Sequence, residues 1–109
     1  LDGVMWFEAR EGLFRYDGHR FLHLSRKDGL PADTVSVLWA DPKGGLWASA
    51  GTGLARISGT QIKRVDNQDG LPESGVLSLA RDASDRLWVA MGRKGLFRED
   101  RPGHFVKVP

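Results

Sequence analysis

The sequence predicts an all-β fold made of small antiparallel sheets, and three observations support this. The tetrapeptide Asp-Gly-Leu-Pro at 28–31 recurs unchanged at 69–72, which is 41 residues later. Trp6, Trp47 and Trp88 follow the same 41-residue step. Glycine is abundant, with 14 in 109 residues, as expected where tight turns join short strands. A repeat of about 40–45 residues with one Trp per unit is typical of a β-propeller blade of four antiparallel strands.

The middle repeat has the most complete set of strand signals. Residues 35–40 are rich in strand-forming side chains and predict the first strand. Pro42 and the two glycines after it favour a hairpin turn into a second strand at 46–50. Gly-Thr-Gly and Ser-Gly-Thr then mark turns into a third strand at 54–57 and a fourth at 61–65. Four strands joined in this way make one blade.

The two flanking repeats follow the same order. In the last repeat, strands are predicted at 76–80, 87–90, 95–98 and 105–108, with extra residues in the turns near 92–95 and 100–103. The first repeat begins late, with strands at 3–6, 12–16 and 21–24, and it lacks a first strand. The predicted organisation is a propeller fragment of about two and three-quarter blades. Its parts are a partial blade at 1–27, a second blade at 28–68 and a third at 69–109.

A closed propeller typically has 4–8 blades, so these units cannot close a ring alone. We therefore expect their partners to be the remaining blades of a larger propeller or further copies of this chain. The absence of an initiator Met agrees with a piece of a longer chain, and residues 1–4 show no signal peptide.

The repeated tetrapeptide lies where one blade connects to the next, and we interpret it as a geometric element. The connection must cross three strand spacings, which is about 14 Å. Residues 66–75 can extend to about 33 Å, so the connection has slack. Glycine supplies backbone freedom, and proline favours an extended conformation in the leucine before it.

Composition and charge exclude several classes of function. The 16 Lys and Arg residues are interleaved with 14 Asp and Glu residues, and the net charge is only +2. Nucleic-acid binding usually needs a basic stripe, so no nucleic-acid partner is predicted. No run of about 18 apolar residues is present, so no direct membrane insertion is predicted. The absence of cysteine excludes disulfides and thiolate chemistry.

Taken together, these motifs resemble the two-component regulator propeller repeat. The resemblance rests on Gly-Leu-Pro followed by Val35, on Asp41 before Gly-Leu-Trp, and on Gly-Leu-Phe-Arg-Tyr-Asp-Gly at 12–18. The last repeat departs from the family pattern at Arg86, which replaces the Gly before Leu-Trp. The middle repeat departs from it at residues 48–50. The resemblance covers nearly the whole chain.

This resemblance implies a non-enzymatic sensory role in the periplasmic region of a bacterial membrane-bound signal-transduction protein. Outputs in such proteins are histidine kinases or nucleotide-cyclising domains. The implied ligand is a small molecule or an oligosaccharide. Two alternatives remain open. One is a protein-interaction scaffold, and the other is part of a propeller lyase whose catalytic residues lie outside this chain.

Residues that break the repeat are the best candidates for ligand contact, because core residues recur with it. Trp39 lies on a predicted innermost strand, and its counterpart is Ala80. Its alternative role is to fill space between blades. The tips of the connections also differ between copies, and loops of one face commonly bind ligands. The predicted ligand-binding residues are therefore Trp39, Asp33, Thr34, Glu73 and Ser74.

Residues that recur with the repeat are interpreted as structural. The tryptophans are expected to pack between blades rather than stack on sugars. The second set is Arg15, Arg56 and Arg98, which are expected to pair with loop acids or carbonyls, although an anion clamp is conceivable. The third set is Asp17, Asp41 and Asp82, which are expected to bond nearby backbone in turns.

Signals for catalysis are poor. There is no Gly-x-Ser-x-Gly or His-Glu-x-x-His motif, and the Gly-Thr-Gly at 51–53 lacks the third glycine of a dinucleotide fingerprint. The three histidines, His19, His23 and His104, fall in outer strands or the turns before them. We therefore predict no enzymatic activity, no cofactor and no metal site.

Overall fold

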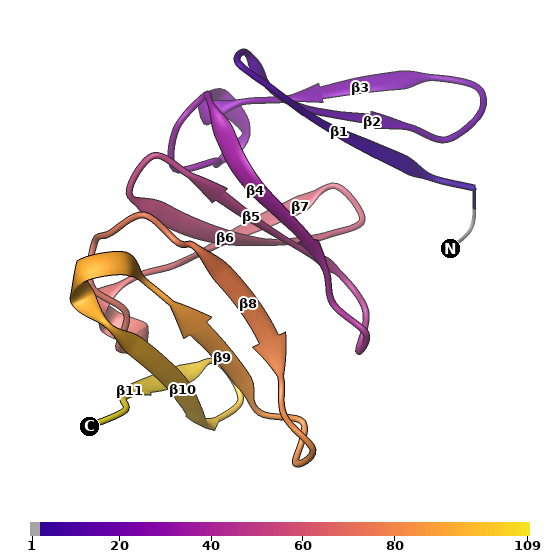
Figure 1. Ribbon diagram of the computed structural model, residues 1–109. Coiled ribbons are helices and arrows are strands. Elements are labelled where there is room, and N and C mark those ends of the chain that lie inside the picture. Colours follow the sequence, from indigo (N-terminus) through magenta and orange to yellow (C-terminus); the bar gives the residue numbers. More distant parts are fainter. Residues whose placement is uncertain (1–2) are drawn as a thin grey trace.

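The computed structural model describes residues 3–109 and shows an all-β protein of three antiparallel sheets (Figure 1). Residues 1 and 2, which the first predicted blade includes, lie outside the described residues. Within each sheet, neighbouring strands are consecutive in the sequence. The first sheet contains β1 (Met5–Ala9), β2 (Gly12–Tyr16) and β3 (Phe21–Leu24). The second contains β4 (Val35–Ala40), β5 (Leu46–Ala50), β6 (Gly53–Ser58) and β7 (Gln61–Val65). The third contains β8 (Ser78–Arg81), β9 (Leu87–Ala90), β10 (Leu96–Arg101) and β11 (His104–Lys107).

The strand predictions are confirmed for the middle sheet and need correction at the ends of the others. β8 begins at Ser78 rather than at residue 76, because its partner β9 ends at Ala90, the residue opposite Ser78. Beyond Ala90 the chain turns, and Met91 bonds back to Gly95 instead of continuing the ladder. β1 runs to Ala9, farther than predicted, because a tight turn places Ala9 opposite Gly12.

The core consists of two apolar clusters, one on each face of the middle sheet. The first cluster joins the first and second sheets and includes Leu13, Leu24, Leu30, Val35, Leu46, Ala48, Ala50, Ala55 and Ile57. The second joins the second and third sheets and includes Trp47, Leu54, Leu71, Val76, Leu79, Leu87, Val89, Met91, Phe97 and Phe105. Successive side chains of a strand point to opposite faces, so β5 contributes to both clusters and all five of its residues are buried.

The recurring tryptophans are not all equally buried. Trp47 is 4% exposed in the second cluster, and Trp6 packs against the first cluster. Trp88 belongs to neither cluster, because its neighbours Leu87 and Val89 take the inward positions of β9. Trp88 therefore faces outward from the third sheet, and inter-sheet packing is confirmed for Trp47 and Trp6 alone.

Each connection between sheets contains a 3₁₀ helix, Arg26–Asp28 in the first and Asn67–Asp69 in the second. The aspartate of the repeated tetrapeptide is the last residue of this helix. Its carboxylate accepts the backbone N–H of the residue that precedes the helix, Ser25 in one copy and Asp66 in the other. The glycine then adopts a left-handed conformation. The leucine enters the core, where Leu30 is 0% and Leu71 is 1% exposed. The geometric interpretation of the tetrapeptide is confirmed, and three of its four residues have defined structural roles.

The two copies of this glycine provide a matched test of packing. Gly29 and Gly70 have φ values of 114° and 98°, so alanine is strained at both, by about 1–3 kcal/mol. A Cβ at Gly29 would meet Ile62 Cβ at an ordinary 3.5 Å, whereas one at Gly70 would collide with the carbonyl oxygen of Phe105. We therefore expect Gly70→Ala to lower the free energy of unfolding at least about 2 kcal/mol more than Gly29→Ala. Urea denaturation of the two variants checks this, and equal losses would contradict the contact.

Candidate functional site

The structure places Trp39 on the middle sheet, directly opposite Trp47 on β5. Its side chain is part-buried and packs against the second cluster. The alternative role that the sequence left open, filling space between sheets, therefore describes its observed contacts. A ligand contact at Trp39 stays a prediction.

Three of the four predicted tip residues make structural hydrogen bonds: Thr34 and Ser74 to neighbouring turns, and Asp33 within its own connection. Thr34 Oγ1 donates to the carbonyl of Arg10 at 3.0 Å, and Asp33 accepts the backbone N–H of Arg26 at 3.0 Å. Ser74 bonds to two turns at once: its N–H donates to Thr52 O, and its hydroxyl donates to Met91 O, both at 3.1 Å. These contacts join the connections to the β1–β2, β5–β6 and β9–β10 turns along one edge of the sheets (Figure 1).

Glu73 is different, because its exposed side chain makes no hydrogen bond or ion pair with any of residues 3–109. It lines a pocket of about 300 Å³ between the second and third sheets. The pocket is lined by Pro31, Thr52, Gly53, Leu54, Arg64, Val65, Asp66, Asn67, Leu71, Pro72, Glu73 and Met91. Of the five predicted ligand-binding residues, Glu73 alone lies in this lining. Asp33 lines a wider hollow between the first and second sheets.

The pocket combines an apolar floor with polar groups at its rim. Leu71 and Met91 are buried there, while Asn67 and Glu73 are exposed. Arg64, also in the lining, is already bound to the backbone, because its guanidinium donates to Gly29 O and Leu30 O at 3.2 Å. Small-molecule sites commonly have this composition of apolar walls with a few polar groups.

The recurring aspartates and tryptophans bond to each other in pairs, Asp41 with Trp47 and Asp82 with Trp88. We call these pairs the brace, and the sequence predicted part of it. Asp41 and Asp82 accept backbone N–H groups within their own turns, as predicted. In addition, each accepts the indole N–H of the tryptophan six residues later, at 2.9 Å from Trp47 and 2.7 Å from Trp88. This bond was not predicted from the sequence, although the constant spacing of six residues between Asp and Trp is a signal for it.

The recurring arginines lie over the tryptophan rings. The guanidinium carbons of Arg15, Arg56 and Arg98 lie 5.8, 5.9 and 5.7 Å from the ring centres of the tryptophans on the adjacent strands, within cation–π range. Arg56 also donates to the carbonyl of Gly44 at 2.9 Å, so the predicted pairing with a turn carbonyl is confirmed for this arginine.

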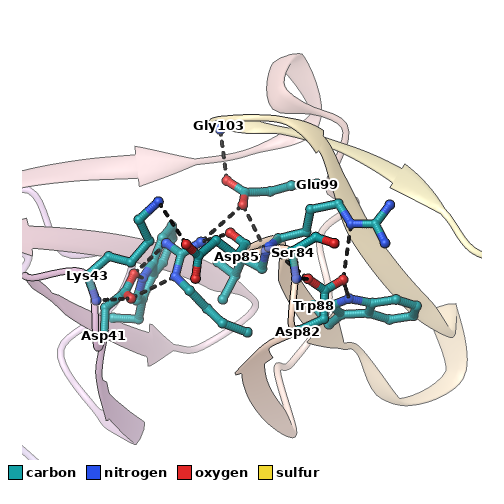
Figure 2. Close-up of polar contacts among 12 residues, drawn as sticks. Asp41, Lys43, Asp82, Ser84, Asp85, Trp88, Glu99 and Gly103 are labelled. Atoms are coloured by element: carbon teal, nitrogen blue, oxygen red, sulfur yellow. Dashed lines mark hydrogen bonds and ion pairs between the residues drawn. The ribbon is translucent and has the colours of Figure 1, made fainter.

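Arg81 connects the second and third sheets through buried ion pairs that the sequence analysis did not identify. Its guanidinium makes a two-pronged contact with Asp41 at 2.7 and 2.8 Å, and it reaches Glu99 Oε1 at 3.3 Å. Side-chain exposure is 12% for Arg81, 0% for Asp41 and 10% for Glu99. Figure 2 shows Glu99 bridging toward the Gly103 N–H, to which its second oxygen binds at 2.9 Å.

A signal for this network was present in the repeat. Arg81 occupies the position of Ala40, and Glu99 occupies the position of Ile57 in the middle copy. Two positions that are apolar in the middle repeat thus carry opposite charges in the last repeat.

The carboxylates of the brace have lowered pKa values. The indole of Trp88, followed by the Arg86 backbone N–H, lowers the pKa of Asp82 to about 2. Burial acts to raise the pKa of Asp41, but hydrogen bonds from Arg81, Trp47 and the Lys43 backbone outweigh it and hold that pKa far below its usual value. Both side chains are therefore carboxylates at neutral pH.

The histidines make separate contacts. The ring of His23 bonds to the carbonyl of Glu11 at 2.6 Å and stacks on Phe14, and His104 bonds to Asp100 at 2.7 Å. Within residues 3–109, no group of three His, Asp or Glu side chains is arranged to hold a metal ion. No helix in this part of the chain is long and apolar enough to cross a membrane.

No protein-family model matches the chain, and no curated protein gives a significant match. The resemblance to the regulator propeller repeat therefore stays a prediction.

The buried ion pairs allow a direct test. Arg81→Met leaves Asp41 and Glu99 buried without their cation, so we expect the free energy of unfolding to fall by about 3–5 kcal/mol. Arg86→Met is the matched control, because it removes an exposed pair with Asp82 that contributes roughly 0.3–0.5 kcal/mol. Urea denaturation at pH 7 measures both, and a loss below about 1 kcal/mol for Arg81→Met would contradict the role assigned to the network.

The brace also predicts an acid dependence. The folded pKa of Asp82, about 2, lies below its ordinary 3.8, so its contribution is fully present above about pH 4 and is lost as the pH falls toward 2. Trp88→Phe removes the main cause, and we expect it to reduce this loss of stability between pH 4 and 2. Trp6→Phe is the control, because that indole has no carboxylate partner among residues 3–109. Unfolding curves across this pH range, with NMR titration of the Asp82 carboxyl, measure the effect.

Proposed function

We propose that the three sheets are successive blades of a β-propeller, and that the chain is a non-enzymatic ligand-binding segment of a bacterial sensory protein. The observation that carries the proposal is the two-sided burial of the middle sheet, with equivalent strands and equivalent connections on each side. Sheets that pack face to face in this way, with one repeat per sheet, are the building units of a propeller.

The outer faces of the first and third sheets support further sheets as partners. Met5 and Phe7 are 50% and 43% exposed on the face of β1 opposite to Trp6. On the third sheet, Trp88 and Leu96 lie on the face away from the second cluster, and Leu96 is 38% exposed. Apolar side chains at both faces fit coverage by remaining blades or by further copies of this chain.

The pocket beside Glu73 is the proposed ligand site. It lies between two blades at the edge where connections and turns meet, and it offers carboxylate, amide and hydroxyl groups from Glu73, Asn67 and Thr52. Its volume suits one sugar unit or a similar small molecule. The proposed ligand is therefore a small polar molecule or the end of an oligosaccharide.

The proposed signal is a small rigid-body shift between blades. A ligand in this pocket contacts both sheets, because Thr52 belongs to the second sheet's turn and Met91 follows the third sheet's β9. Ser74 already ties these two turns. Widening or narrowing the pocket therefore changes the angle between neighbouring sheets. The periplasmic location and the membrane-bound output are part of this proposal and rest on the family resemblance.

A protein-interaction scaffold is the second candidate, and one observation favours it. Phe21 and Leu77 are 68% and 69% exposed, more than the other large apolar side chains of residues 3–109. Contiguous exposed apolar patches commonly mark protein contact surfaces, so a scaffold role requires that Phe21 or Leu77 be part of such a patch.

The ligand proposal is tested by titrating the labelled chain with neutral hexasaccharides of glucose and of xylose, observed by backbone amide NMR. We expect saturable shifts at Thr52, Asn67 and Glu73, and at least about threefold weaker binding in Glu73→Gln, which loses a charge-assisted hydrogen bond. Glu8→Gln, an exposed acid on β1 outside the pocket, should bind as the wild type does. Binding that is unaffected by Glu73→Gln, or shifts confined to the outer faces, would refute the pocket as the site.

A further inference from the structure

A second pocket lies between the same two sheets, and the proposed function does not use it. Its volume is about 330 Å³. It is lined by Lys43, Trp47, Arg56, Lys63, Val65, Asp69, Arg81, Asp85, Glu99, Pro102 and Gly103. Four of these side chains are cationic and three are acidic, so the pairing among them decides which charges remain available.

Most of these charges are already paired. Arg81 binds Glu99 and Asp41, and Lys43 lies 3.8 Å from Asp85. Figure 2 shows Lys43 and Asp85 reaching toward each other from the second and third sheets. The Asp69 carboxylate accepts the backbone N–H of Asp66 at 3.1 Å. Among residues 3–109, no ion pair involves Arg56 or Lys63.

Arg56 and Lys63 are also directly opposite each other on β6 and β7. Residues so placed lie on the same face with their Cβ atoms about 4.5–5.5 Å apart, and two like charges in this arrangement destabilise a sheet. Lys63 therefore adds a second positive charge beside Arg56, and among residues 3–109 no carboxylate forms an ion pair with either cation, although Asp69 also lines the pocket.

The repeat shows that this arrangement is particular to the middle sheet. The recurring arginine faces Leu22 in the first sheet and Val106 in the third. Only here does a lysine replace the apolar partner. The buried, unpaired Nε of Arg56 is not the distinguishing feature, because Arg98 has the same one.

We propose that this pocket binds a small anion, a carboxylate or phosphate with an apolar body, through Arg56 and Lys63. An anionic group between the two cations replaces their repulsion by two attractive contacts, and the planar guanidinium and the ammonium both donate to such oxygens. Val65 and Pro102 supply apolar wall for the rest of the ligand. The site shares Val65 with the Glu73 pocket and otherwise differs from it in its lining and in the charge it selects.

Backbone amide NMR titration with phenyl phosphate and with benzoate tests this site, with benzyl alcohol as the neutral analogue. We expect saturable shifts at Arg56 and Lys63, which line this pocket and not the Glu73 pocket, for one or both anions, which identifies the preferred group. No comparable shifts are expected for benzyl alcohol. Lys63→Gln should weaken binding about fivefold or more. Lys107→Gln, an exposed lysine on the outer strand of the next sheet and outside the pocket, should leave it unchanged. Equal binding in the two variants, or equal binding of benzyl alcohol, would overturn the proposal.

A second measurement does not depend on the choice of probe. Lys63→Glu exchanges the like-charge pair for an opposite pair across β6 and β7, so the midpoint of thermal unfolding should rise by about 1–5 °C. The same variant should lose the shifts caused by both anions. An unchanged or lower midpoint would show that Arg56 and Lys63 do not repel each other, and the argument for an anion would then fail.

Discussion

The burial of the middle sheet on both faces is the constraint on which the rest of the structure depends. A sheet covered on one side can alternate apolar and polar residues, but β5 has every residue buried and carries no charged side chain. Its one hydroxyl side chain, Ser49, is also buried. Its side chains divide between two clusters, with Trp47 on one face and small residues such as Ala48 on the other. The buried leucine of each connection, Leu30 or Leu71, packs into the cluster at its interface.

Polar groups are buried in these interfaces, and the brace supplies hydrogen-bond partners for several of them. The indole of Trp47 lies in an apolar cluster with its N–H bonded to Asp41, so a large ring is buried without an unsatisfied donor. Asp41 in turn accepts the Arg81 fork from the next sheet. One carboxylate thereby satisfies its own turn, its own sheet's tryptophan and a cation of the neighbour. The Arg81–Asp41 contact forms only when the second and third sheets are in the observed relative position. Apolar packing alone is less directional than this contact.

The interface between the second and third sheets carries both pockets, and this follows from where the repeats differ. The connections place Glu73 at one pocket, whereas the turns near Lys43 and Asp85 border the other. Between these two pockets the interface is filled by the second cluster, so a ligand in either one bears on the same pair of sheets. Lys63 departs from the repeat, because the equivalent residues in the other sheets are apolar. The side chain of Glu73 makes no hydrogen bond or ion pair with residues 3–109. A binding role for this interface agrees with the propeller proposal. It does not depend on which ligand binds.

Local patterns in the sequence determined the strands of the middle sheet, the tight turns and the special role of the repeated tetrapeptide, because propensity and turn chemistry act over a few neighbouring residues. They also marked Glu73, whose side chain is free of structural bonds. Only the tertiary structure decided that Thr34 and Ser74 are held by turns of neighbouring hairpins, and that Arg81 reaches Asp41 forty residues away. Those contacts depend on how two sheets lie against each other, and that distance and angle follow from the packing of side chains across the whole interface rather than from any one segment.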